Sequence, residues 1–108
     1  PGWALRALVS YDRWLWERLD GADACQRMAF ALSAYNGGIG WLGRDRKLAA
    51  RRGYRTDCWF GQVEEANAGR RASSFRENRR YVRLILLERQ YWYRKAGWGP
   101  GIGCGGAR

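Results

Sequence analysis

The segment from Ala24 to Asn36 constrains the fold most, because it is apolar on every face. One stripe at helical spacing consists of Ala24, Met28, Ala31 and Tyr35, and Phe30, Leu32 and Ala34 make the remaining faces apolar. A short helix of this kind belongs inside a domain. Gly37 and Gly38 follow it and adopt positive φ at low cost, so the helix can stop there. The sequence therefore predicts a buried helix that presents a phenol and a carboxamide at its end, beside a bare backbone.

The rest of the chain predicts further helices and no strand of useful length. Periodicity favours helices over residues 3–19, 39–52 and 74–96, and a short one over 57–66. Residues 67–73 have the composition of a loop. We expect one all-α domain over residues 1–96, followed by a Gly-rich tail over 97–108.

Polar residues before three of these helices predict how the helices start. Asp20 or Asp23 can cap the helix that begins near Ala24, and Asp57 can cap the short helix. Ser74 and Glu77 have the spacing of a capping box for the last helix. We also expect Glu77 to pair with a nearby arginine.

The net charge of the chain limits which partners it can bind. Twenty Lys and Arg residues against ten Asp and Glu give a net charge of +10, which favours nucleic acid, anionic membranes or the acidic bacterial envelope. The basic clusters 44–52 and 70–80 and the pair Glu64-Glu65 have the composition of solvated faces. No apolar run reaches the ~20 residues that span a bilayer, and charges in residues 1–19 interrupt any signal sequence.

The ligands of a metal site are mostly missing. The chain has no His and no Cys-x-x-Cys pair, so we expect neither a metal nor a cofactor. One disulfide between Cys58 and Cys104 is our first choice, and three separate thiols are the alternative.

Two segments resemble a known family. Residues 31–40 read Ala-Leu-Ser-Ala-Tyr-Asn-Gly-Gly-Ile-Gly, and residues 77–86 read Glu-Asn-Arg-Arg-Tyr-Val-Arg-Leu-Ile-Leu. The first resembles the Ala-Tyr-Asn-Gly/Ala-Gly-x-Gly signature of soluble lytic transglycosylases and their phage endolysin relatives, which cleave peptidoglycan. The second is similar to the Glu-Thr/Asn-Arg-x-Tyr-Val-x-x-Ile-Leu run of the last helix in that family, and the two occur in the family order.

The resemblance implies a lysozyme-like helical fold whose helices line a sugar cleft. Tyr35 matches the family tyrosine that supports the catalytic carboxylate, and Tyr81 matches a tyrosine near the cleft. Asn36 would bind sugar hydroxyls or the N-acetyl group, while Gly37 and Gly38 shape the turn. The family cuts the MurNAc-GlcNAc β-1,4 bond with one Glu, which acts first as acid and then as base, and it forms a 1,6-anhydro product.

The catalytic Glu of the family does not have a counterpart in this sequence. The family places it in a Glu-Ser pair upstream of the Ala-Tyr-Asn signature, and none of the five glutamates here precedes a serine. We therefore expect the acid, and the helix that carries it, to lie before Pro1. On this interpretation the chain supplies the cleft wall and is itself inactive.

Three functions remain open from the sequence. The leading one is a peptidoglycan-cleaving enzyme of viral or bacterial origin, which acts in the periplasm or cell wall and is monomeric when complete. Its partners would be glycan strands and anionic envelope polymers, with no nucleic acid. The alternatives are a basic helical module that binds nucleic acid, supported by the charge of +10, and a non-catalytic domain that binds the cell wall.

Overall fold

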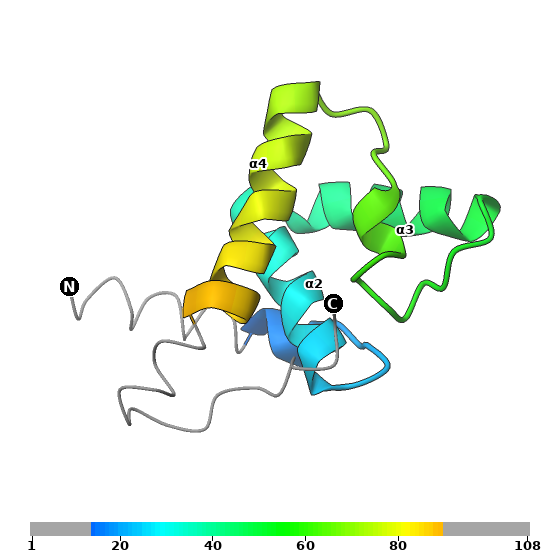
Figure 1. The fold of residues 1–108 in the computed structure, drawn as a ribbon. Helices are drawn as coiled ribbons and strands as arrows, with labels where there is room; N and C mark the ends of the chain where they lie inside the picture. Colours follow the sequence, from blue (N-terminus) through cyan, green and yellow to red (C-terminus); the bar gives the residue numbers. More distant parts are fainter. Residues whose placement is uncertain (1–13, 90–108) are drawn as a thin grey trace, which may run out of the picture.

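Helix α2 (Ala24–Gly37) packs against both α3 (Ile39–Arg51) and α4 (Ala72–Arg83) in the computed structural model, which describes residues 14–89 (Figure 1). It starts at Asp23, whose Oδ1 accepts a hydrogen bond from the Gln26 N–H at 2.8 Å. Its buried residues are Cys25, Ala29, Phe30, Ala31, Leu32, Ser33 and Ala34. The prediction of a buried central helix is confirmed, because small residues let α3 and α4 approach closely on different sides.

The aromatic centre of the core comes from α2 and from the long connection between α3 and α4. Trp59 and Phe30 are both fully buried, and their rings meet edge to face with centroids 5.8 Å apart. Gln26 fixes this connection, since its Oε1 accepts hydrogen bonds from the N–H groups of Trp59 at 2.6 Å and Phe60 at 3.2 Å. Packing and one polar side chain thus hold a segment that has little regular structure.

The predicted helix over residues 57–66 is wrong. Only the single turn η1 (Val63–Glu65) is helical there, and it is a 3₁₀ turn. Asp57 does not cap a helix; its carboxylate pairs with Arg55 at 2.8 Å. Gly61 has a φ of 71°, which is outside the helical range and breaks any helix at this point.

The last helix begins two residues earlier than predicted, and the capping box is wrong. Arg71 is the N-cap of α4 and makes no side-chain cap hydrogen bond, so Ser74 lies within the first turn. Asn67 explains the shift: its Oδ1 accepts from the N–H of Arg70 at 2.8 Å and its Nδ2 donates to the Arg70 carbonyl at 2.9 Å. This turn is complete at Arg70, and the helix follows at once.

Helix α4 continues into η2 (Leu84–Arg89), a π-helical segment. Val82 and Leu86 are buried, while Tyr81 and Ile85 pack against the core from its edge. The predicted end of this helix near residue 96 and the tail 97–108 lie outside the described residues. Of the predicted first helix, residues 14–18 are helical and residues 3–13 lie outside the described part.

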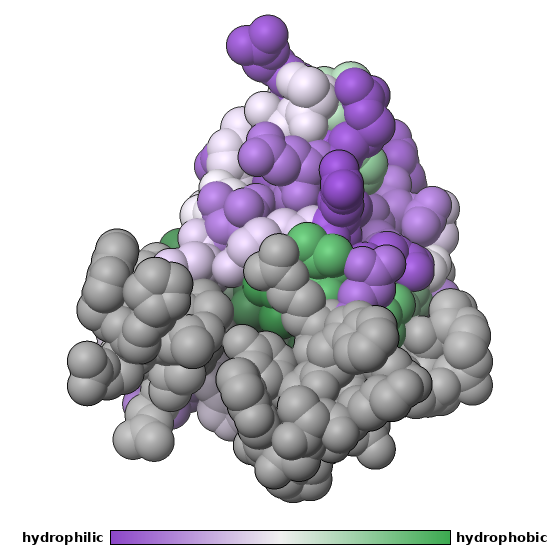
Figure 2. Space-filling view, turned by 60° about the vertical axis from the view of Figure 1, so that its left-hand side comes forward, coloured by the Kyte–Doolittle hydropathy of each residue, from purple (hydrophilic) through white to green (hydrophobic). Residues whose placement is uncertain are grey.

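The prediction of an all-α fold is confirmed for the part of the chain that the structure describes, since residues 14–89 contain helices and no strand. The finer expectation of a lysozyme-like arrangement stays a prediction. Within the same range no helix is both long and apolar enough to cross a bilayer. Figure 2 shows one face of the molecule, where hydrophilic side chains cover the upper part, at the end where α4 begins.

Candidate functional site

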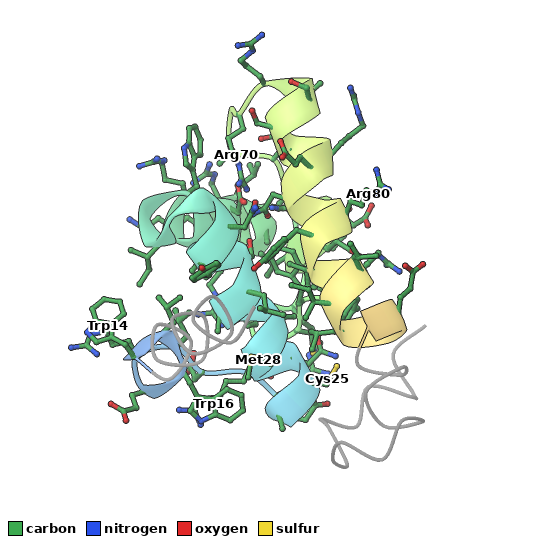
Figure 3. The ribbon with its side chains drawn as sticks, turned by 90° about the vertical axis from the view of Figure 1, so that its left-hand side faces the viewer. Trp14, Trp16, Cys25, Met28, Arg70 and Arg80 are labelled. Carbon is green, nitrogen blue, oxygen red and sulfur yellow. The ribbon has the colours of Figure 1, made fainter. Side chains whose placement is uncertain are left out.

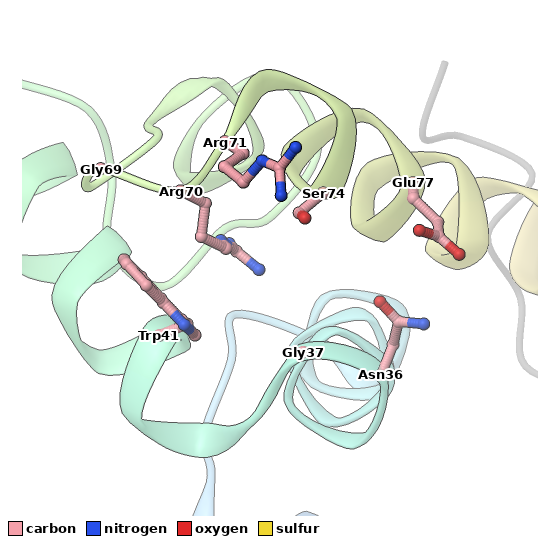
Figure 4. Close-up of a pocket in the computed structure, with 8 residues that line it drawn as sticks. All are labelled: Asn36, Gly37, Trp41, Gly69, Arg70, Arg71, Ser74 and Glu77. Carbon is pink, nitrogen blue, oxygen red and sulfur yellow. The ribbon is translucent and has the colours of Figure 1, made fainter.

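A pocket of about 470 Å³ opens where the end of α2 and the start of α3 face the start of α4 (Figure 4). Apart from one aromatic ring and two glycines, its lining consists of two basic, two uncharged polar and one acidic residue. The lining residues are Asn36, Gly37, Trp41, Gly69, Arg70, Arg71, Ser74 and Glu77. Of the residues predicted to bind substrate, the structure places Asn36 and Gly37 in this pocket, while Gly38 and the two tyrosines are not part of its lining.

Tyr35 and Tyr81 lie together even though 46 positions separate them in the sequence. Their rings are stacked, with centroids 6.4 Å apart and planes at 15°. Tyr35 is 36% exposed, so part of this residue lies at the surface, next to Asn36 in the sequence. The two predicted tyrosines therefore form one aromatic pair, beside Asn36 in the sequence but outside the lining of the pocket.

Asn78 connects the two segments that carry the family resemblance. It is 1% exposed, and its Nδ2 donates to Asn36 Oδ1 at 2.9 Å and to the Ser33 carbonyl at 3.0 Å. Its Oδ1 accepts from Ser33 Oγ at 2.8 Å and from Arg79 Nη1 at 2.7 Å. The oxygen of the Asn36 amide therefore accepts a hydrogen bond from Asn78, which holds the Asn36 side chain in one orientation. In this orientation the NH₂ group of Asn36 can donate to an acceptor outside the core.

Sequence reasoning did not single out Asn78 as a site residue. A signal was present, since Asn78 is four residues before Val82 and eight before Leu86, on the apolar stripe of α4. A polar residue on such a stripe must find partners inside the protein.

The two glycines at the end of α2 have different roles. Gly38 has a φ of 98°, which agrees with the positive φ expected where the helix stops. Gly37 has no positive φ and is the last residue of α2, so that part of the expectation is wrong. A Cβ on Gly37 would lie 2.7 Å from Arg70 Nη1 and 2.9 Å from Asn78 Nδ2. The side chains of Arg70 and Asn78 therefore leave room for no residue larger than glycine at position 37.

Below the pocket lies a buried ionic cluster around Asp45. This carboxylate is fully buried and pairs with Arg70 Nη2 and, at 3.0 Å, with Arg79 Nη2. Its Oδ1 also accepts from the Ala68 N–H at 3.0 Å. Burial lowers the pKa of Arg79, and the attraction of Asp45 opposes this shift. The cluster locks α3, the 63–71 connection and α4 into one frame beneath the site.

The basic clusters and Glu64 are not uniformly solvated, which corrects the expectation from sequence. Arg79 donates to the carbonyls of Glu64, Val63 and Ala66 from inside the protein. Figure 3 shows Arg70 directed between α3 and α4, whereas Arg80 points away from α4. Part of the charge of the cluster 70–80 is thus used within the fold.

The two neighbouring glutamates at positions 64 and 65 differ in burial. Glu64 is 4% exposed and its carboxylate pairs with Arg83 at 2.5 Å, so the prediction of a solvated face is wrong for it. Glu65 is exposed, as predicted.

Glu77 is exposed at the edge of the pocket. It makes no ion pair with another residue of the range 14–89, so the predicted salt bridge to an arginine is wrong there. Glu77 is the one carboxylate among the pocket-lining residues.

The predicted disulfide is wrong. Cys58 is a free thiol, and Cys25 is disulfide-bonded. Burial raises the pKa of Cys58, which makes it less reactive than a solvated thiol. Between residues 14 and 89 no group of three or more His, Cys, Asp or Glu side chains is arranged to hold a metal ion.

We compared the chain with protein-family models, with curated proteins and with solved structures, and none of these comparisons gives a significant match.

Proposed function

We propose that this chain forms one wall of the glycan-binding groove of a peptidoglycan-cleaving enzyme, a lytic transglycosylase or a lysozyme-like endolysin. Its substrate would be the MurNAc-GlcNAc β-1,4 bond in the periplasm or cell wall. The observation that carries the proposal is the meeting of the two family-like segments: Asn36 is hydrogen-bonded to Asn78 at 2.9 Å, and Tyr35 stacks on Tyr81. Residues 31–40 and 77–86 thus build one site together.

The exposure of the site residues supports the proposal. Tyr35 and Asn36 both reach the surface beside a pocket, as a sugar-binding edge requires. Stacked phenol rings offer an apolar face to a pyranose, and the fixed Asn36 amide offers a donor to an N-acetyl carbonyl. If both side chains had been packed in a dry interior with no groove beside them, the assignment would have had no basis.

The proposal places the general acid outside the described glutamates. A carboxyl group that stays protonated near neutral pH needs burial against apolar groups. Glu77 lines the pocket but is exposed, and Glu64 is buried but paired with Arg83. Neither environment is suited to a proton donor, so the role of this chain is to position the glycan and, through Tyr35, to orient an acid supplied by other sequence.

Digestion of purified peptidoglycan by the protein from the complete open reading frame tests this proposal. We expect soluble muropeptides that end in 1,6-anhydro sugars when products are resolved by mass. Sugars terminated by water would instead identify a lysozyme. Retention on peptidoglycan without any released muropeptide would support the non-catalytic wall-binding alternative, and salt-sensitive binding to DNA with no affinity for peptidoglycan would support the nucleic-acid alternative.

In the same assay Tyr35→Phe tests the supporting phenol. We expect turnover to fall by less than about 100-fold, because general acid–base groups contribute about 10²–10⁴-fold and a supporting residue contributes less. Tyr54→Phe is the matched control, since Tyr54 is also partly exposed and lies outside the pocket lining. Equal turnover of the two variants would remove Tyr35 from the mechanism.

A further inference from the structure

We infer that the pocket beside Asn36 binds a carboxylate group, and that Arg70 and Arg71 recognise it. The inference rests on the proposed function, since it identifies the carboxylate as one carried by the peptide attached to a muramoyl residue. Three features of the described residues support it: a pocket-lining arginine with a buried donor that has no partner, a helix start without a side-chain cap, and a lining that favours a single negative charge.

The first feature is Arg70. Its side chain is only 6% exposed, it lines the pocket, and its Nε is buried without a hydrogen-bond partner. Among residues 14–89 its side chain makes one hydrogen bond, from Nη2 to Asp45. Nη1 lies against Gly37, itself a lining residue, at 2.7 Å from where a Cβ would be. Figure 4 shows the Arg70 guanidinium extending into the space between Trp41 and Ser74. An unsatisfied buried donor is costly, so Arg70 is suited to a ligand that accepts hydrogen bonds.

The second feature is the start of α4, which reaches the same pocket. Helix α4 has 12 residues and its N-cap, Arg71, makes no side-chain cap hydrogen bond. The first-turn N–H groups therefore lack the partner that a capping side chain would provide, and they carry the positive end of the helix dipole. Arg71 is exposed and Ser74 lies in the first turn, and both line the pocket. The pocket lining thus combines Arg70 with a second cation and a hydroxyl group from the start of α4.

The third feature is the limit on ligand charge. Glu77 also lines the pocket, and the ion pair with the buried Asp45 neutralises part of the positive charge of Arg70. A dense polyanion such as nucleic acid or a phosphate polymer would bring several negative charges close to Glu77, whereas a monoanion with uncharged polar groups brings only one. The volume of about 470 Å³ exceeds what a bare ion needs, and Trp41 provides an apolar wall. A carboxylate on a saccharide-linked peptide matches these properties.

Binding to defined muropeptides tests the inference without any need for turnover. The probes are an N-acetylmuramoyl dipeptide with a free terminal carboxylate, the same compound with that carboxylate amidated, and inorganic phosphate. Each is titrated into the full chain while the assigned Trp41 indole N–H is followed by NMR. Arg71→Gln is the test variant, and Arg76→Gln is the control, because Arg76 is exposed on α4 with the same charge but does not line the pocket.

We expect the carboxylate form to shift the Trp41 signal. Arg71→Gln should weaken its binding about tenfold, as loss of a charge-assisted hydrogen bond predicts. Arg76→Gln should change it less than twofold, and the amidated form should bind about tenfold more weakly to the unaltered chain.

Equal affinity for the acid and the amide, or equal effects of the two substitutions, would overturn the inference and leave the proposed glycan groove standing. Phosphate binding at Trp41 with no response to either muropeptide would also overturn it, in favour of a small-oxyanion site. Peptidoglycan digestion then decides the proposed function independently.

Discussion

Removal of the Asn78 side chain should destabilise this protein strongly, because Asn78 connects α4 to the end of α2. Asn78→Ala deletes four hydrogen bonds, of which three are buried and the one to Asn36 is partly buried; three are with neutral groups of Ser33 and Asn36 and one is with the guanidinium of Arg79. A neutral bond contributes about 1 kcal/mol and a bond to a charged group about 1.5–3 kcal/mol. The sum is about 5 kcal/mol, and neighbouring bonds are not additive, so we expect a loss of about 3–5 kcal/mol.

Urea and thermal unfolding followed by circular dichroism measure this loss. A domain of this size has a total stability of about 5–15 kcal/mol, and each kcal/mol shifts Tm by about 4–8 °C. Asn78→Ala should therefore lower Tm by at least about 12 °C.

Ser33→Ala is the matched control for this substitution. It removes only the Ser33 Oγ bond, and Asn78 Oδ1 keeps its bond from Arg79, so the expected cost is about 1 kcal/mol. If Asn78→Ala costs no more than Ser33→Ala, then Asn78 does not hold the two segments together, and the reasoning about the site is refuted.

Three further outcomes follow from the structure. Asp45→Asn should cost about 3–5 kcal/mol in urea unfolding, because two buried arginines lose their counter-ion; a cost below 1 kcal/mol would contradict the ionic cluster. Gly38→Ala should destabilise the protein by about 1–2 kcal/mol, because Gly38 has a φ of 98°. Gly43 lies within α3 with open space around it, so Gly43→Ala should stabilise the protein by about 1 kcal/mol. Equal changes in Tm for the two variants would refute this contrast. Alkylation mapped by mass spectrometry without reductant should label Cys58 and leave Cys25 unlabelled. Because the pKa of Cys58 is raised, its labelling should need a higher pH than that of free cysteine.

Local chemistry determined the elements that the sequence predicts well. Helix α2 was predicted within one residue at each end, because an apolar run with Asp23 before it and glycine after it has few alternatives. Residues 39–51 form α3, which lies between Gly38 at its start and Gly53, with a φ of 82°, beyond its end. The exposure of Tyr35 and Asn36 also followed from the pattern, since the helix stops directly after them.

The elements that were predicted wrongly depend on contacts with distant residues. The segment 57–62 is held by Gln26 and not by its own helix hydrogen bonds, and α4 starts early because Asn67 completes the preceding turn. Cys58 is free although its place in the sequence favoured pairing.

The sequence by itself determined an all-α domain, the end of α2 and the presence of polar groups there. The tertiary structure alone decided which arginines are buried, that Gly37 serves close packing, and that Asn78 fixes Asn36. The reason is physical: helix propensity and capping act over a few residues, whereas the partner of a buried charge or amide is chosen by how α2, α3 and α4 pack, at separations of 25 to 45 residues in the site.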